Sequence, residues 1–192
     1  MDTKRLSLII VIAAVTIVLS PSISRMAIPF PLAPFLLFGI WEIPIVAAFV
    51  FISRKAGIAI AVINAIGLTI LFPGALPTGP IYNLIAILSM LLGIYIFQIV
   101  LKTGHKFKIE SKYDETKFVI LSTLLAIILR VGVMTGVNYV VLRYPYPIGY
   151  ELDQLVILAY LPIIALFNAI VAFYTVPLGL YLARAVNRYL KI

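Results

Sequence analysis

Six long apolar runs, separated by short charged or proline-rich segments, constrain the fold of this chain more than any other feature. An α-helix needs about 20 predominantly apolar residues to cross the hydrocarbon layer of a membrane. Of the 192 residues, 64% are hydrophobic and only 11% are charged, and a soluble domain of this length could not cover so much apolar surface. The sequence therefore predicts an all-α integral membrane protein with the lipid bilayer as its solvent.

The predicted spans are bounded by charges, prolines and glycines. They cover roughly residues 6–20, 35–52, 56–72, 81–101, 118–142 and 155–183. The last run is longer than one untilted crossing, so it either begins above the membrane or bends near Pro162. Without a repeat or a separate soluble segment, residues 1–192 are expected to form one domain, a six-transmembrane-helix bundle.

Basic residues set the expected orientation. All but three of the 15 lie on one side of the predicted membrane: Lys4, Arg5, Arg54, Lys55, the five lysines of the Lys102–Lys117 loop, Arg184, Arg188 and Lys191. The exceptions are Arg25 and Arg143 on the other side and Arg130 within a span. The positive-inside rule then predicts a multi-pass protein of the cell membrane with both termini cytoplasmic. The same rule accounts for the net charge of +8 without a nucleic-acid partner.

The start of the chain also has the basic end and apolar stretch of a secretory signal peptide. No small-x-small cleavage site follows it, which favours a retained first helix.

The residues that several kinds of catalytic and metal chemistry require are missing from this sequence. The only histidine, His105, lies in a predicted cytoplasmic loop, and no aspartate lies within a predicted span. The chain has no cysteine, no P-loop motif and no cluster with metal-ligand spacing. We therefore predict no catalytic residues, no metal, no cofactor and no enzymatic activity. Any energised work must be driven by another subunit or by an ion gradient.

Polar residues inside membrane spans usually face the bundle interior or a cavity. Glu42 and Arg130 lie at similar predicted depth, which permits a salt bridge between them. A structural pair, a ligand-binding role and an ion-coupling carboxylate all remain open for them. Asn83, Asn138 and Asn168 converge towards the outer half and together favour a pocket open to the exterior, whereas interhelical hydrogen bonding explains any single asparagine equally well. Tyr139 belongs to the same neutral polar set and is a further candidate for ligand binding. A stripe at helical spacing, formed by Leu161, Ala165, Asn168, Ala172, Thr175 and Gly179, predicts a packed interior face.

Two outward connections are stiff, apolar and rich in proline. They read PFPLAPFLLFGIWEIP over residues 29–44 and FPGALPTGPIYN over residues 72–83. Loops exposed to solvent are usually polar, so these are expected to fold back over the bundle as a lid. Phe30, Phe35 and Trp41 would offer flat apolar surface to a ligand, and Glu42 a polar anchor.

Three segments resemble one family. IPFPLAPFLLFGIWEIPIVAAF is similar to the first loop and second helix of the riboflavin-specific substrate-binding (S) component of energy-coupling factor (ECF) vitamin transporters. MTGVNYVVLRYP resembles the end of that family's fifth helix, and LPIIALFNAIVAFYTVPLGLYLAR resembles its sixth. The resemblance covers most of the chain in order and spacing.

This resemblance implies a subunit that captures a vitamin, here riboflavin, from outside in a pocket of the last three helices. It also implies partners: a transmembrane coupling subunit bound to two cytoplasmic ATPases, on which the S component topples to release its ligand inward. Family members dock through Ala-x-x-x-Ala in the first helix. Here that region offers adjacent Ala13 and Ala14, whereas Ala61 and Ala65 have the spacing in the third helix, where packing within the subunit is the alternative.

Other functions stay open. The riboflavin type carries a lysine soon after the Phe-Asn of the sixth helix, but here Ala169, Ile170 and Val171 follow, which leaves an S component for a different vitamin as an alternative. A stand-alone proton-coupled carrier of small molecules that uses Glu42 is a second alternative. A membrane protein with a purely structural role is a third.

Overall fold

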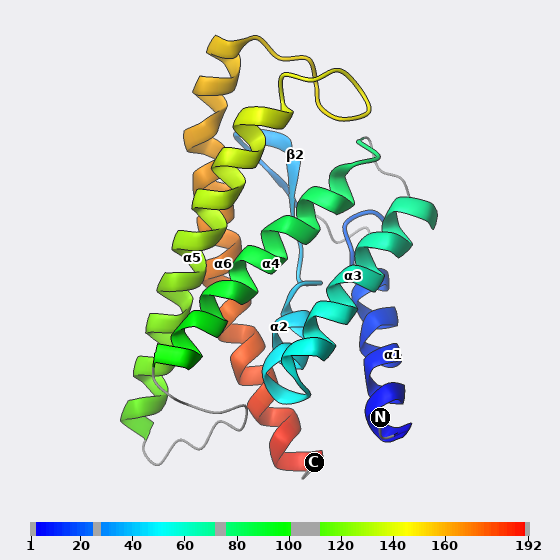
Figure 1. Ribbon diagram of the computed structural model, residues 1–192, viewed down its shortest axis with the longest axis vertical. Coiled ribbons are helices and arrows are strands. Elements are labelled where there is room, and N and C mark those ends of the chain that lie inside the picture. The colour runs from blue at the N-terminus through cyan, green and yellow to red at the C-terminus, as the bar shows by residue number, and fades with distance from the viewer. Residues whose placement is uncertain (1–2, 25–27, 72–75, 101–111, 191–192) are drawn as a thin grey trace.

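The computed structural model describes residues 3–24, 28–71, 76–100 and 112–190. Within them lie six helices and one two-stranded antiparallel hairpin (Figure 1). The helices are α1 (Thr3–Val18), α2 (Ile43–Phe51), α3 (Arg54–Leu71), α4 (Gly79–Val100), α5 (Lys112–Val141) and α6 (Gln154–Leu190), and the strands are β1 (Ile28–Phe30) and β2 (Ala33–Phe38). The long helix α5 packs on both α4 and α6, α2 packs on α6 and α3, and α1 packs on α3.

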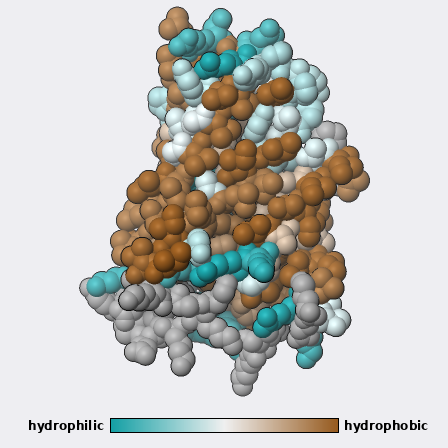
Figure 2. Space-filling view, viewed as in Figure 1, coloured by the Kyte–Doolittle hydropathy of each residue, from teal (hydrophilic) through white to brown (hydrophobic). Residues whose placement is uncertain are grey.

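Four of the described helices are long and apolar enough to cross a membrane: α3, α4, residues Thr116–Val141 of α5 and residues Gln154–Arg188 of α6. Helix α1 has 16 residues and α2 has nine, so α2 is only about 14 Å long. Apolar residues form a broad band across the middle of the molecule, with hydrophilic residues towards its two ends (Figure 2). The chain is thus a multi-pass membrane protein by its helices, and the number of six spans stays a prediction.

The predicted helix over residues 35–52 is wrong in its first half. Residues 33–38 form β2, and α2 begins only at Ile43, with Pro44 in its first turn. In the hairpin, Ile28 pairs with Phe38 and Phe30 with Ala33. Pro29, Pro31 and Pro34 explain the difference, because proline removes a backbone donor and disfavours a helical residue before it. A strand and a helix share the same apolar composition here, and only the prolines separate them.

Helix α2 lies at the centre of the main apolar core. Six consecutive residues, 45–50, are buried, because α1, α3 and α6 all contact this short helix. At Gly179 of α6 a Cβ atom would lie 2.6 Å from the Cβ of Val46, so the glycine permits the close contact between α6 and α2. The predicted interior stripe of α6 is confirmed from Asn168 onward, and its first two members, Leu161 and Ala165, are half-buried.

The start of α1 and the end of α6 lie towards the same end of the molecule (Figure 1). The starts of α3 and α5 lie at that end too, which brings together the described basic residues that were predicted to share one side: Lys4, Arg5, Arg54, Lys55, Lys117, Arg184 and Arg188. Arg25, Lys191 and most of the Lys102–Lys117 loop lie outside the described residues. The cytoplasmic orientation of this end stays a prediction.

Candidate functional site

A pocket of about 340 Å³ lies between the hairpin, the start of α2, the first half of α4, the second half of α5 and the middle of α6. Seven of the nine predicted ligand-binding residues line it: Phe35, Trp41, Glu42, Asn83, Arg130, Asn138 and Asn168. Its volume falls within the range of about 300–1,000 Å³ that is usual for small-molecule sites. The structure therefore brings together residues from four separate segments of the sequence.

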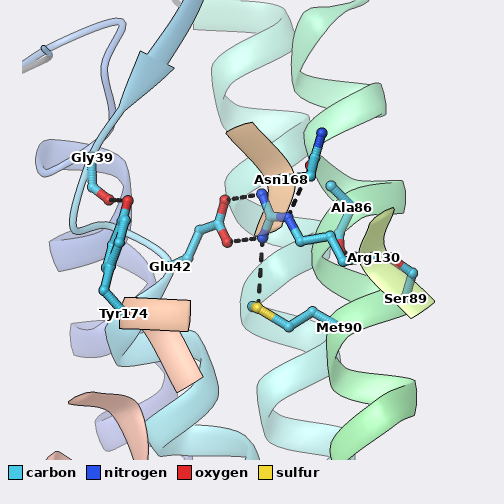
Figure 3. Close-up of polar contacts among 8 residues, drawn as sticks. All are labelled: Gly39, Glu42, Ala86, Ser89, Met90, Arg130, Asn168 and Tyr174. Atoms are coloured by element: carbon cyan, nitrogen blue, oxygen red, sulfur yellow. Dashed lines mark hydrogen bonds and ion pairs between the residues drawn. The ribbon is translucent and has the colours of Figure 1, made fainter. Parts of the chain in front are cut away.

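The charged pair at the inner wall of the pocket joins α5 to the start of α2 (Figure 3). Arg130 donates from Nη1 and Nη2 to the two carboxylate oxygens of Glu42, and the Nη2···Oε1 distance is 2.9 Å. Glu42 is 4% exposed and Arg130 is 2% exposed. Charges buried this deeply need a partner, and the two residues predicted to share a depth supply it to each other.

The remaining nitrogen of the guanidinium is also engaged. Arg130 Nε donates to Asn168 Oδ1 at 3.1 Å, and Asn168 Nδ2 donates to the carbonyl oxygen of Ile164 at 2.9 Å. On the opposite side, Arg130 Nη1 lies 3.6 Å from the sulfur of Met90 (Figure 3). Asn168 thus orients the arginine, and both polar atoms of its amide bond to protein groups.

Tyr174 holds the segment that presents Glu42. Its hydroxyl donates to the carbonyl oxygen of Gly39 at 2.7 Å (Figure 3). Glu42 occupies the N-cap position of α2 but makes no side-chain capping bond, since its carboxylate faces Arg130. Sequence reasoning missed Tyr174, although Phe167, Val171 and Tyr174 have the spacing of one helix face, and all three line the pocket.

Several polar groups of the pocket wall remain available to a ligand, and the Ser22 hydroxyl is one of them. Asn138 donates from Nδ2 to the carbonyl oxygen of Met134 at 2.8 Å, which leaves its Oδ1 as an acceptor. Asn83 is exposed and makes no side-chain hydrogen bond with the described part of the chain. The Tyr150 hydroxyl is a further group, and burial raises its pKa above the ordinary value of a tyrosine, so at neutral pH it is an uncharged donor.

The hairpin forms the apolar outer wall. Pro34, Phe35, Leu36 and Leu37 of β2 line the pocket. The ring of Phe35 lies with its centroid 5.6 Å from that of Tyr150 and 5.7 Å from that of Tyr160. These aromatic contacts connect the hairpin to the loop before α6 and to α6 itself.

Phe30 and Tyr139, the other two predicted ligand-binding residues, do not line the pocket. Phe30 is buried beneath the hairpin, with its ring centroid 5.5 Å from Phe38 and 5.7 Å from Phe167. Tyr139 faces outward, and the guanidinium of Arg143 lies 4.7 Å from its ring centroid. Phe30 instead anchors the hairpin on α6.

The loop between α5 and α6 is tied to the start of α4. Thr78 Oγ1 donates to the carbonyl oxygen of Pro147, and the Tyr82 hydroxyl donates to that of Ile148, both at 2.7 Å. Tyr82 also lines the pocket. In the second proline-rich connection, residues 72–75 lie outside the described residues, while Leu76, Gly79 and Pro80 line the pocket.

The four alanines considered for partner docking differ in exposure. Ala13, Ala61 and Ala65 are 4%, 1% and 6% exposed, and all three pack within the chain. Ala14 lies on the exposed face of α1, where Ile10, Val11, Val15 and Val18 are exposed as well. The Ala-x-x-x-Ala motif of α3, Ala61 and Ala65, therefore packs inside this subunit. Of the four alanines, only Ala14 lies at the surface.

Metal-binding groups do not gather anywhere in the part of the chain that the structure describes. The site therefore offers hydrogen bonds, aromatic surface and one internal ion pair.

Comparisons with known proteins point in one direction. Neither a protein-family model nor a curated protein sequence matches the chain. A solved structure described as "Structure and mechanism of the S component of a bacterial ECF transporter" matches 100% of this chain and 100% of its own, with 26% sequence identity and a TM-score of 0.74. The neighbour is a transporter component and not an enzyme. This likeness over the full length supports a membrane-embedded, substrate-binding subunit of a transporter.

Proposed function

We propose that this protein is the substrate-capture subunit of an ECF-type transporter, which binds a vitamin from outside the cell for ATP-driven uptake by partner subunits. The observation that carries the proposal is the pocket of about 340 Å³ in a fold that resembles an S component from end to end. Its partners would be a transmembrane coupling subunit and two cytoplasmic ATPases.

Riboflavin is the ligand that we propose. An isoalloxazine ring is flat, with apolar faces and a rim of hydrogen-bonding atoms. Phe35, Trp41 and Phe167 in the pocket wall suit its faces, and the amide of Asn83 and the free Oδ1 of Asn138 suit its rim. Ala169, Ile170 and Val171 follow Asn168 in place of a nearby lysine, and Val171 lines the pocket, so an S component for another vitamin is the main alternative.

Calorimetry with purified protein in detergent tests the ligand. We expect riboflavin to bind with nanomolar to micromolar affinity, and the purified protein to carry flavin fluorescence. Heat with thiamine or biotin but none with riboflavin would move the assignment to another vitamin.

The docking face for the coupling subunit would include the exposed side of α1 around Ala14. Small residues allow helices to approach closely in a membrane, so Ala14→Trp should reduce assembly with the coupling subunit while ligand binding is retained.

The carrier alternative assigns a different role to Glu42. A proton-coupled carboxylate must be able to release and take up its proton during transport, whereas Glu42 is held by two hydrogen bonds from Arg130. Uptake into vesicles that needs ATP and the partner subunits supports our proposal. Uptake by the isolated protein that follows a pH gradient and is lost in Glu42→Gln would support the carrier.

A further inference from the structure

The charges that line the pocket cancel. Among the described lining residues, Glu42 and Arg130 are the only ones with a formally charged side chain, and each neutralises the other through the two-pronged pair. All three guanidinium nitrogens already donate to protein atoms. The described wall of the pocket therefore offers neither a free cation to an anionic ligand nor a free carboxylate to a cationic one.

The groups that remain available are uncharged. They include the acceptor oxygen of Asn138, the amide of Asn83 and the hydroxyls of Tyr150 and Ser22. A ligand that carries a charge would lose part of its hydration on entering this partly enclosed pocket, and it would gain no opposite charge from the described wall in return. A neutral ligand would lose only hydrogen bonds to water, which these groups can replace.

We propose that the pocket selects uncharged ligands and that Glu42 is the residue that sets this specificity, because it cancels the charge of Arg130. This inference rests on the proposed function for the binding event itself. Applied to flavins, it favours riboflavin over the 5′-phosphate of the same molecule, whose phosphate carries about −1.5 to −2 charge at pH 7.

The effect of Glu42 on selectivity should be large enough to measure. Two unit charges about 10 Å apart, at an effective dielectric constant of about 20, interact strongly enough to change an affinity about tenfold. Glu42→Gln leaves the charge of Arg130 uncancelled and should favour the phosphorylated ligand. Arg130→Gln leaves the charge of Glu42 uncancelled and should disfavour it further. The two single variants thus shift the same ratio in opposite directions.

The test measures the dissociation constants of riboflavin and riboflavin 5′-phosphate by flavin fluorescence with the full-length protein in detergent at pH 7.5. In the wild type we expect riboflavin to bind at least tenfold more tightly than its phosphate. Glu42→Gln should reduce the ratio of the dissociation constant of the phosphate to that of riboflavin about tenfold, and Arg130→Gln should increase it. The double variant Glu42→Gln with Arg130→Met should return this ratio to the wild-type value. Glu151→Gln is the matched control, since it makes the same change in net charge at an exposed residue and should leave the ratio unchanged.

Equal affinities for the two flavins in the wild type overturn the inference, whether or not any variant folds. A ratio that Glu42→Gln and Glu151→Gln shift equally also overturns it, because the effect is then one of net charge alone. If neither flavin binds, the riboflavin assignment fails, and the charge inference is decided with biotinamide and biotin, which share a skeleton and differ by one carboxylate. Preferential binding of biotinamide then supports the inference, and preferential binding of biotin overturns it.

Discussion

At the scale of single residues, Arg130 is a buried charged side chain that needs partners for its hydrogen-bond donors. A guanidinium that is 2% exposed has lost nearly all contact with solvent. The free-energy cost of this desolvation is offset only if its N–H donors find partners in the protein. Glu42 from the start of α2, Asn168 from α6 and the sulfur of Met90 from α4 surround it. One residue of α5 thus connects three other helices immediately beside the pocket.

Removing one partner of this pair should destabilise the fold. We expect Glu42→Gln to lower the free energy of unfolding by about 3–5 kcal/mol, because it leaves a buried arginine uncompensated. Adding Arg130→Met should recover part of the loss, which a double-mutant cycle of thermal unfolding in detergent will quantify. Additive losses in the cycle would contradict a direct interaction between the two side chains.

The asparagines should separate into two groups. Asn83→Ala and Asn138→Ala should each weaken ligand binding by about 1–3 kcal/mol, because polar atoms of the ligand are left without partners. The melting temperature without ligand should change little. Asn168→Ala should lower that melting temperature, since Asn168 bonds both Arg130 and Ile164. Titration calorimetry and thermal unfolding of the three variants together test this division, and equal effects on apo stability would contradict it.

At the scale of elements, the hairpin forms one wall of the pocket, and we expect it to act as a lid over the ligand. It is short, its prolines limit the conformations that it can adopt, and Phe30 packs beneath it against Phe38 and Phe167. A cover that is already ordered loses little entropy when it closes over a ligand. Its main effect should therefore be on the rate at which the ligand escapes.

Phe30→Ala should detach this cover. We expect it to raise the dissociation rate of the ligand about tenfold with little change in the association rate, because the hairpin loses its anchor on α6 while the walls formed by the helices are retained. Leu32→Ala in the exposed turn of the hairpin is the control and should leave both rates unchanged. Stopped-flow fluorescence of Trp41, the only tryptophan and a pocket residue, measures them, and unchanged rates in Phe30→Ala would argue against a lid.

The contact between α4 and α5 depends on one glycine. A Cβ atom at Gly93 would lie 2.6 Å from the Cα of Ala126, so Gly93→Ala must push the two helices apart. We expect a loss of about 1–3 kcal/mol of stability. Gly132→Ala is the matched control, because a Cβ atom there would meet no atom of the described residues within 4 Å, and the helix itself favours alanine. Thermal unfolding of the two variants should show a melting temperature below that of the wild type for Gly93→Ala but not for Gly132→Ala.

At the scale of the whole molecule, an apolar band separates two hydrophilic ends (Figure 2). The starts of α1, α3 and α5 and the end of α6, with their basic residues, lie at one of these ends. The hairpin and the pocket lie towards the other half. This arrangement suits capture on one side of a membrane and contact with ATP-driven partners on the other.

The orientation can be tested directly, because the chain contains no cysteine. We expect single cysteines at Lys55 and Arg188 to react with an impermeant maleimide only after the cells are permeabilised. A cysteine at Arg143, on the loop between α5 and α6, should react in intact cells. All three positions are exposed, and labelling in the reverse order would invert the predicted topology.

The sequence by itself determined the solvent, the class of fold and most of the pocket. Long apolar runs with almost no charge are stable only in lipid, and helical spacing places Asn168, Ala172, Thr175 and Gly179 on one buried face. Residues as rare in a membrane as Glu42 and Arg130 are informative because their burial is so costly. Seven of the predicted ligand-binding residues line the pocket for these reasons.

Only the tertiary structure decided how those residues divide their roles. Hydropathy does not separate a strand from a helix over residues 33–38, and nothing local reveals that Phe30 packs beneath the hairpin while Phe35 faces the pocket. The two-pronged pair of Glu42 and Arg130 joins positions 88 residues apart. The hydroxyl of Tyr174 donates to the carbonyl oxygen of Gly39, which lies 135 residues earlier in the chain. Contacts of this kind depend on how whole helices pack, because the partner of a buried polar group is fixed by geometry in space and not by spacing along the chain.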